Sequence, residues 1–279
     1  MMEQITSVQN PKIKELLALQ EKSRLRREKG VFVVEGRREL EHCINAGFKV
    51  RTVFICPEIA GVTDSVRMSV GIIPTDPFIM SLSLAGGSII EVSRAVYDKV
   101  AYRGGTEGVI AEVYSKENSL ESLELGENPL VIVLEGVEKP GNLGAVLRSA
   151  DAAGVDAVLI CDPLTDIYNP NLIRASIGAV FTQQVACCAS SDAIGFLKRK
   201  GIRIYTAQLQ DSEWYYDTDM RCGTAIAIGT EATGLTDQWR EAADAHIKIP
   251  MLGRLDSLNA SVSAAILLYE AVRQRNSNR

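Results

Sequence analysis

The second half of the chain alternates between apolar runs and helical patterns, and this alternation constrains the fold most strongly. LVIVL (130–134) is an unbroken apolar run, which is typical of a strand buried on both faces of a sheet. A helical pattern follows it, and further strand-like runs come later. These runs are DAVLI (156–160), IRIY (202–205), TAIAIG (224–229) and HIKIP (246–250). Strands that alternate with helices predict an α/β fold whose mostly parallel sheet is covered by helices on both faces.

The first half predicts a second, smaller α/β unit. The strands expected there are VFVVE (31–35), VRTVFI (50–55) and GVIAEVY (108–114). The helices expected there cover 10–28, 37–46 and 76–84. Residues 115–129 are polar, lose this periodicity and end in Asn-Pro, as a linker does. We therefore expect a domain over 1–114, a linker over 115–129 and a second domain over 130–279.

The length and composition are those of a soluble globular protein: the chain has 279 residues, of which 46% are hydrophobic and 23% are charged. No segment stays apolar for long enough to cross a bilayer, and charges interrupt the start of the chain where a secretion signal needs an apolar stretch. Six cysteines form no C-x-x-C pair, and two histidines supply a zinc site poorly. We expect a cytoplasmic protein with reduced thiols, no metal and no membrane association.

Basic residues concentrate near the start of the chain although the net charge is −5. Within 22–38, seven Lys/Arg residues stand against two acidic residues. Such a patch suits guided binding of a polyanion, although a solvated helix face with i,i+4 charge pairs explains it equally well. The candidates for phosphate contacts are Arg24, Arg26, Arg27, Arg37 and Arg38.

The residues that follow each strand of a parallel sheet are the first place to look for a ligand site. Here these segments are EGVEKPGN, TAQLQDS, GTEATG and PMLGRLDSLN. None of them carries a dinucleotide fingerprint, a P-loop lysine or a G-x-S-x-G nucleophile. What remains is Asn, Arg, Glu, Ser and backbone amides. Such a set positions and polarises two bound substrates, which suits group transfer.

The segment PGNLGAVLRSADAAG (140–154) predicts a helix with Asn142 as its N-cap and Gly154 as its stop. Arg148 lies on the helix face that it shares with Gly144 and Asp151. It is either a solvated charge or part of a site. The terminal helix, over 259–275, has an apolar face made by Val262, Ala265, Ile266, Tyr269 and Val272.

Three segments of the second half resemble, in the same order, the three motifs of the SpoU/TrmH group of SPOUT methyltransferases. These segments are NLGAVLRSADAAG, IAIGTEATGL and IKIPMLGRLDSLNASVSAAILLYEA. NPKIKELLAL and FVVEGRRELEHCINAG are similar to the L30e-like RNA-binding domain of members that act on ribosomal RNA. The resemblance implies methyl transfer from S-adenosylmethionine to a ribose 2′-hydroxyl, a trefoil-knotted C-terminal domain and a homodimer whose sites draw residues from both subunits.

The resemblance also implies site residues. Its catalytic set is Asn142, Arg148, Glu231, Ser257 and Asn259. Its cofactor set is Thr206, Ala207, Leu209, Gly229, Ile249, Met251 and Leu258. Three of the catalytic residues, Asn142, Ser257 and Asn259, have a simpler alternative as helix N-caps. Ala232 stands where many members of the group have glycine, which puts the shape of that loop in question.

The expected partner is structured RNA rather than DNA, and 23S ribosomal RNA rather than tRNA, because tRNA members of the group usually lack the N-terminal domain. Two alternatives remain open: the same chemistry on tRNA, and a ribosome-assembly protein that binds RNA without transfer. A third, a nicotinamide-dependent oxidoreductase, lacks the nucleotide fingerprint.

Overall fold

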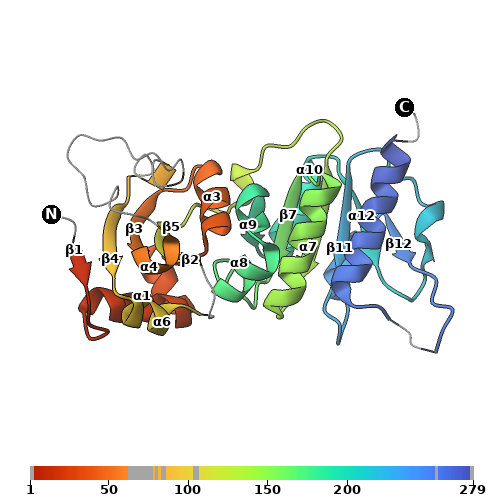
Figure 1. The fold of residues 1–279 in the computed structure, drawn as a ribbon. Coiled ribbons are helices and arrows are strands. Elements are labelled where there is room, and N and C mark those ends of the chain that lie inside the picture. Colours follow the sequence, from red (N-terminus) through yellow and green to blue (C-terminus); the bar gives the residue numbers. More distant parts are fainter. Residues whose placement is uncertain are drawn as a thin grey trace. The chain divides into compact units, whose positions relative to one another are not determined.

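The computed structural model describes residues 3–61, 78, 81–82, 86–102, 107–254 and 257–276 (Figure 1). The chain forms two compact units. The first contains Met1–Lys116 and Ile167–Phe181, and the second contains Glu117–Asp166 and Thr182–Arg279. A segment of the predicted second domain therefore folds with the first unit.

The first unit is built on a five-stranded sheet in the order β1-β4-β3-β5-β2. The strands are β1 (Glu3–Ile5), β2 (Val31–Glu35), β3 (Val50–Ile55), β4 (Ser88–Val92) and β5 (Val109–Tyr114). Pairing is parallel between β1, β4 and β3, and antiparallel between β3, β5 and β2. Strands β2, β3 and β5 were expected from the sequence, whereas the short β1 and β4 were not.

The helices of this unit include one correction. They are α1 (Pro11–Glu21), α2 (Ser23–Lys29), α3 (Arg37–Asn45), α4 (Pro57–Ala60), α6 (Arg94–Val100), α8 (Pro170–Ser176) and α9 (Ala179–Thr182). The single helix predicted over 10–28 is broken at Lys22, whose backbone is extended. Arg26 stabilises the break because its guanidinium bonds to the carbonyls of Leu19 and Gln20 at the end of α1. The helix predicted over 76–84 lies mostly outside the described residues.

Aromatic stacking explains why Ile167–Phe181 belongs to the first unit. The ring of Tyr168 stacks on Phe32 of β2 with 4.2 Å between centroids. Phe181 contacts the same ring, with 5.8 Å between centroids, and also packs edge-on against Phe48. Burying several aromatic side chains together is a strong reason for a segment to leave its neighbours in the sequence.

The second unit is built on a seven-stranded sheet in which every pairing is parallel, in the order β10-β12-β9-β11-β6-β7-β8. The strands are β6 (Leu130–Glu135), β7 (Ala157–Cys161), β8 (Val185–Cys188), β9 (Arg203–Ala207), β10 (Glu213–Trp214), β11 (Thr224–Ile228) and β12 (Ala245–Lys248). This sheet confirms the predicted α/β class. The expected linker contains the short helix η1 (Leu120–Ser122), and Leu120 is buried in the core of the second unit.

Helices cover both faces of this sheet, as predicted. They are α7 (Pro140–Ala153), α10 (Ser190–Arg199), α11 (Asp237–Ala242) and α12 (Ala260–Asn276), together with the short helix η2 (Tyr215–Asp217). Val131 and Val133 of β6 pack in one core cluster with side chains of α10 and α11. Successive strand residues point to opposite faces, and α7 and α12 pack together on the other face (Figure 1). Among the described residues, no helix combines the length and apolar character needed to cross a bilayer.

Two expectations about the helices need correction. Helix α7 begins at Pro140 with Lys139 as its N-cap, so Asn142 lies inside the first turn and is not the cap. Proline at the first helical position explains this earlier start. The apolar face predicted for α12 is largely uncovered within one chain, because Val262 and Tyr269 are 46% and 49% exposed. The buried side is lined instead by Ala260, Ala264, Leu267, Leu268 and Ala271.

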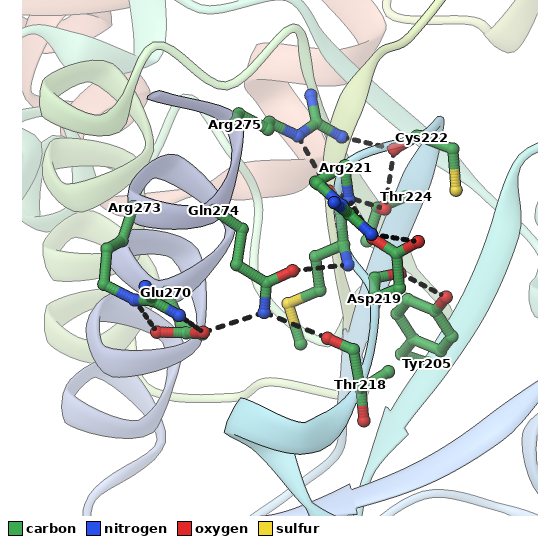
Figure 2. Close-up of polar contacts among 11 residues, drawn as sticks. Tyr205, Thr218, Asp219, Arg221, Cys222, Thr224, Glu270, Arg273, Gln274 and Arg275 are labelled. Carbon is green, nitrogen blue, oxygen red and sulfur yellow. Dashed lines mark hydrogen bonds and ion pairs between the residues drawn. The ribbon is translucent and has the colours of Figure 1, made fainter. Parts of the chain in front are cut away.

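Arg275 fixes the end of α12 to the amino ends of two central strands. Its guanidinium donates hydrogen bonds of 2.7–3.2 Å to the carbonyl oxygens of Asn128, Pro129, Met220 and Cys222. These carbonyls lie just before β6 and β11, and Figure 2 shows the guanidinium reaching toward Cys222. The planar fork of arginine suits several acceptors at once, so this single side chain holds helix and sheet in register.

Glu270, one turn earlier on α12, is the centre of a second polar network. Its side chain is 8% exposed and accepts hydrogen bonds from Arg273 and from Gln274 (Figure 2). Gln274 continues the network to the backbone of Thr218 and Met220. The hydrogen bond from Arg273 holds the pKa of the Glu270 carboxyl below its usual value. This network stabilises the C-terminal half of α12, away from the helix start.

Candidate functional site

A pocket of ≈ 410 Å³ lies at the carboxyl ends of β9, β11 and β12. Its size falls within the roughly 300–1,000 Å³ typical of small-molecule sites. The walls come from residues within 207–210, 228–235, 247–251 and 257–258, and from the first turns of α12. This is the edge of the sheet at which strand ends in a parallel fold are expected to form a ligand site.

Most of the residues that the sequence assigns to a cofactor line this pocket. They are Ala207, Leu209, Gly229, Ile249, Met251 and Leu258, and the catalytic candidate Ser257 lies with them. Thr206 is the exception and a correction. It is fully buried in β9, with its hydroxyl 2.6 Å from Nδ1 of His246, and it does not line the pocket. Adjacent strand residues point to opposite faces, so Thr206 cannot share the position of Ala207.

The loop after β11 forms one wall of the pocket and depends on a glycine at 229. A Cβ atom at Gly229 would lie 2.1 Å from the carbonyl carbon of Gly234 and 2.4 Å from the amide nitrogen of Leu235. The chain therefore passes closely over itself here. Two backbone hydrogen bonds between Thr230 and Gly234 close the loop, and Ala232 lies exposed at its tip.

Three of the catalytic candidates meet at the rim of this pocket. Oε1 of Glu231 accepts hydrogen bonds from the amides of Asn142, at 3.0 Å, and Asn259, at 2.7 Å. The Asn259 amide also donates to Oδ1 of Asn142 at 3.1 Å. Asn142 lies in the first turn of α7 and Asn259 directly precedes α12, so the cluster joins the ends of two helices to the loop after β11. Each member is held by the other two.

Lys139 completes the surroundings of Glu231, and the sequence analysis did not single it out. Its Nζ atom lies 2.9 Å from Oε2 of Glu231. The hydrogen bonds from Lys139 and Asn142 lower the pKa of the Glu231 carboxyl. The group therefore stays ionised to more acidic pH than an ordinary glutamate. Its position could have been noticed from the sequence, because Lys139 lies in EGVEKPGN, one of the segments that follow a strand and are expected to form a ligand site.

Asn259 performs both of the roles that its sequence context allows. Its Oδ1 atom accepts from the backbone N–H and the hydroxyl of Ser261, at 3.0 Å and 2.6 Å, as an N-cap does. Its amide nitrogen meanwhile bonds to Asn142 and Glu231. The cap thus fixes the direction in which the amide points into the cluster.

Arg148 lies outside this cluster. Six residues separate it from Asn142, which places it about 9 Å further along α7 and on a different side of the helix. Its side chain is exposed, and in the described part of the chain it makes no hydrogen bond or ion pair. A single chain therefore assembles Asn142, Glu231 and Asn259 but does not bring Arg148 to them.

The basic patch of the first unit keeps four of its five candidates at the surface. Arg24 and Arg27 are exposed on α2, and Arg37 and Arg38 lie in the first turn of α3 with side chains 40% and 55% exposed. Arg26 is a correction, because it is 4% exposed and its guanidinium is used on the carbonyls of α1. Charge spacing alone could not distinguish it from its neighbours.

A second pocket, of ≈ 370 Å³, lies in the first unit beside Arg38. Tyr102 and Arg174 share its lining, and the Arg174 guanidinium lies over the Tyr102 ring, 4.8 Å from its centroid. Tyr102 is 51% exposed. The lining also includes Glu35, Glu39 and Glu107, so this pocket combines an accessible aromatic ring with side chains of both charges. Arg38, Tyr102 and Arg174 lie far apart along the chain, and no spacing in the sequence predicts that they converge.

Trp214 and Tyr216 form a separate exposed aromatic pair in the second unit. Their rings stack with 6.4 Å between centroids, and Nζ of Lys248 lies 4.8 Å from the Trp214 ring. The pair extends from β10 into η2, beyond the pocket lining.

Comparison with known proteins gives two matching family models. One, described as the SpoU rRNA methylase family, matches residues 129–269, and the other, an MRM3-like substrate-binding domain, matches residues 10–111. The 23S rRNA (guanosine-2′-O-)-methyltransferase RlmB of Vibrio cholerae is 36% identical over 73% of this chain and 85% of its own length. The 23S rRNA (guanosine(2553)-2′-O)-methyltransferase RlmP of Bacillus subtilis is 28% identical over 96% of this chain and 98% of its own length.

A solved structure adds the fold. The AdoMet-bound rRNA methyltransferase from Sinorhizobium meliloti is 26% identical, with a TM-score of 0.86 over 99% of both chains. Both units therefore have counterparts in a single known chain.

Proposed function

Because this chain belongs to the SpoU rRNA methylase family, we propose that it transfers a methyl group from S-adenosylmethionine to a ribose 2′-hydroxyl of 23S ribosomal RNA. The observation that carries the proposal is the cluster of Asn142, Glu231 and Asn259 at the rim of a pocket of small-molecule size. The separate first unit, which matches a substrate-binding family, favours ribosomal RNA over tRNA.

The pocket residues fit S-adenosylmethionine, which supplies an electrophilic methyl group on its sulfonium when bound. Leu209, Ile249 and Leu258 provide apolar walls of the kind that suit an adenine ring. The crowded turn at Gly229 brings backbone close to the ligand space, and the ionised Glu231 places negative charge at the rim for a cationic ligand. A trefoil knot made by the loops after β9, β11 and β12 is part of the proposal, and their meeting at one pocket supports it.

The chain's own residues then have to orient the weakly acidic ribose 2′-hydroxyl so that its oxygen attacks the methyl carbon on the side opposite the sulfur. Glu231 holds the amides of Asn142 and Asn259, which orient the ribose by hydrogen bonds. Arg148 presents the planar, bidentate donor fork of a guanidinium. We assign it to the phosphate beside the target ribose and to the negative charge that develops on the attacking oxygen.

The first unit would bind the RNA itself. Arg24, Arg27, Arg37 and Arg38 supply phosphate contacts, and the pocket beside Tyr102 supplies a stacking surface. Structured RNA is recognised largely through its shape and backbone, so a cluster of this kind needs no short sequence motif.

The uncovered apolar face of α12 supports a homodimer. Val262 and Tyr269 expose large side chains two turns apart on one helix, and Arg148 is missing from the cluster within a single chain. We propose that two copies pair through this face and that the partner copy supplies Arg148 to each site.

We expect Val262→Glu to convert a dimer, with twice the 30.4 kDa mass of the chain, into a monomer. A buried glutamate at a self-complementary interface occurs twice and lacks a cationic partner. Sedimentation velocity measures the mass. Leu164→Glu changes another exposed residue, 64% exposed, and should leave the dimer intact. A wild-type monomer, or a dimeric Val262→Glu variant, would contradict this interface.

Calorimetric titration tests the proposed cofactor. We expect one S-adenosylmethionine to bind per chain, with competition by S-adenosylhomocysteine and no heat from NAD⁺ at the same concentrations. The pocket matches the first two ligands, whereas the chain lacks the dinucleotide fingerprint. Binding of NAD⁺ without binding of S-adenosylmethionine would instead favour the oxidoreductase.

A further inference from the structure

Glu135, the last residue of β6, is a buried carboxylate that is held by hydroxyl and backbone N–H groups. Its residue exposure is 4%, and no lysine, arginine or histidine forms an ion pair with it among the described residues. Instead, Oε2 accepts the backbone N–H of Thr236 at 2.8 Å, and Oε1 accepts the Thr236 hydroxyl at 2.6 Å. Burying a charge is costly unless hydrogen bonds compensate it, so these contacts are essential to its presence there.

Thr236 is the point at which the pocket loop ends. The wall formed by Gly229–Leu235 stops one residue before it, and α11 begins one residue after it. Thr236 occupies the N-cap position of α11, but its hydroxyl does not cap that helix. The hydroxyl and the backbone N–H both point to Glu135. The carboxylate therefore ties the far end of the loop to the central strand β6.

A second tie runs from Glu135 to the body of α11. The Ser190 hydroxyl accepts the indole N–H of Trp239 at 2.9 Å, and its one hydrogen faces two carboxylates, Oδ2 of Asp162 at 2.6 Å and Oε1 of Glu135 at 3.1 Å. Trp239 is fully buried, and the next residue on α11, Arg240, lines the pocket. Glu135 therefore fixes the end of the loop directly through Thr236, and it shares with Asp162 the Ser190 hydroxyl that holds Trp239 of α11.

We propose that Glu135 is a positioning residue that holds the loop 229–235 in the conformation that binds S-adenosylmethionine, an inference that rests on the proposed function. Glu135 is not among the residues that line the pocket, so it acts through the loop. The loop carries Glu231, and its place at the rim depends on both ends of the loop. The β11 end is fixed by the sheet, and the other end is fixed by Glu135.

The variant Glu135→Gln keeps the size of the side chain and removes its charge. We expect the Kd for S-adenosylmethionine, measured by calorimetry, to rise about tenfold, because hydrogen bonds to a charged group are lost at the loop. Amide hydrogen exchange over 229–236 should accelerate in the ligand-free protein. Glu270→Gln is the control, since it removes the charge of another buried carboxylate of the second unit, one that is not in the pocket lining, and it should change the Kd less than twofold.

Thr236 supplies an independent test that leaves Glu135 in place. Thr236→Val removes the hydroxyl and should weaken binding, whereas Thr236→Ser keeps it and should restore wild-type affinity. A purely structural role would lower the melting temperature of Glu135→Gln and Glu270→Gln alike without separating their Kd values, and that result would overturn the inference. Failure of the wild-type protein to bind S-adenosylmethionine would contradict the proposed function instead. The role of Glu135 in holding the loop would still be tested, because amide hydrogen exchange over 229–236 is compared between the ligand-free wild type and the ligand-free Glu135→Gln variant.

Discussion

Replacing Arg148 by alanine is expected to lower methyl transfer by about 10²–10³-fold, the cost of removing one group that stabilises developing charge in other enzymes. The Kd for S-adenosylmethionine and the melting temperature should stay unchanged. The physical reason is its position: Arg148 is exposed on α7, makes no hydrogen bond or ion pair in the described part of the chain, and is not among the residues that line the pocket. Alanine is also a favourable helix residue.

Single-turnover rates with saturating RNA measure this effect. Arg148→Lys keeps the charge but not the bidentate fork, so it should recover only part of the rate. Arg199→Ala, on the exposed side of α10, is the matched control and should transfer methyl groups like wild type. Equal loss of cofactor binding in Arg148→Ala would show that the arginine is structural, and an unchanged rate would remove it from the site.

Gly229→Ala is expected to abolish measurable binding of S-adenosylmethionine while the protein remains folded. The new Cβ would lie 2.1–2.4 Å from three backbone atoms of Gly234 and Leu235, none of which can move without opening the loop. Overpacking of this kind costs roughly 1–3 kcal/mol. At the end of a strand and beside an exposed loop, that strain is relieved by moving the pocket wall rather than by unfolding the sheet.

Calorimetry and thermal denaturation separate these outcomes. Gly141→Ala is the matched control, since it adds a methyl group beside the same cluster, in the first turn of α7, where the new Cβ would meet no atom within 4 Å other than those of its chain neighbours and of the nearby helix backbone. It should bind the cofactor normally. Tight binding by Gly229→Ala would show that the loop tolerates rearrangement and that its closed form does not define the site.

The sequence predicted β6, β7, β9, β11 and β12 of the second unit because short apolar runs such as LVIVL are typical of strands buried on both faces, whereas the short β8 and β10 were not expected. It could not reveal which distant loops meet. Asn142 and Glu231 are 89 positions apart and come together because β6 and β11 are neighbours in the sheet. Strand order depends on packing between elements, which periodicity within each element does not record.

The corrections have equally local causes. Nothing in the sequence around Arg26 distinguishes it from the basic residues beside it. It is buried because α1 ends just before it and leaves a backbone carbonyl, that of Leu19, to accept a hydrogen bond from its guanidinium. Helix α12 carries small and apolar residues on several sides, so its pattern did not reveal which side faces the sheet. The resemblance to a known family supplied the residues of the pocket, and the structure then separated those at its wall from Thr206, which lies fully buried in β9.

Transfer of labelled methyl groups from S-adenosylmethionine to separated, unmodified rRNA and tRNA tests the proposed reaction and its RNA substrate together. Methylation of a ribose 2′-hydroxyl makes the next phosphodiester resistant to alkali, so labelled resistant dinucleotides identify the product. We predict such dinucleotides from 23S rRNA incubated with the wild-type protein, and none with Arg148→Ala. Label in tRNA alone, or label in rRNA that alkali releases as mononucleotides, would contradict the account.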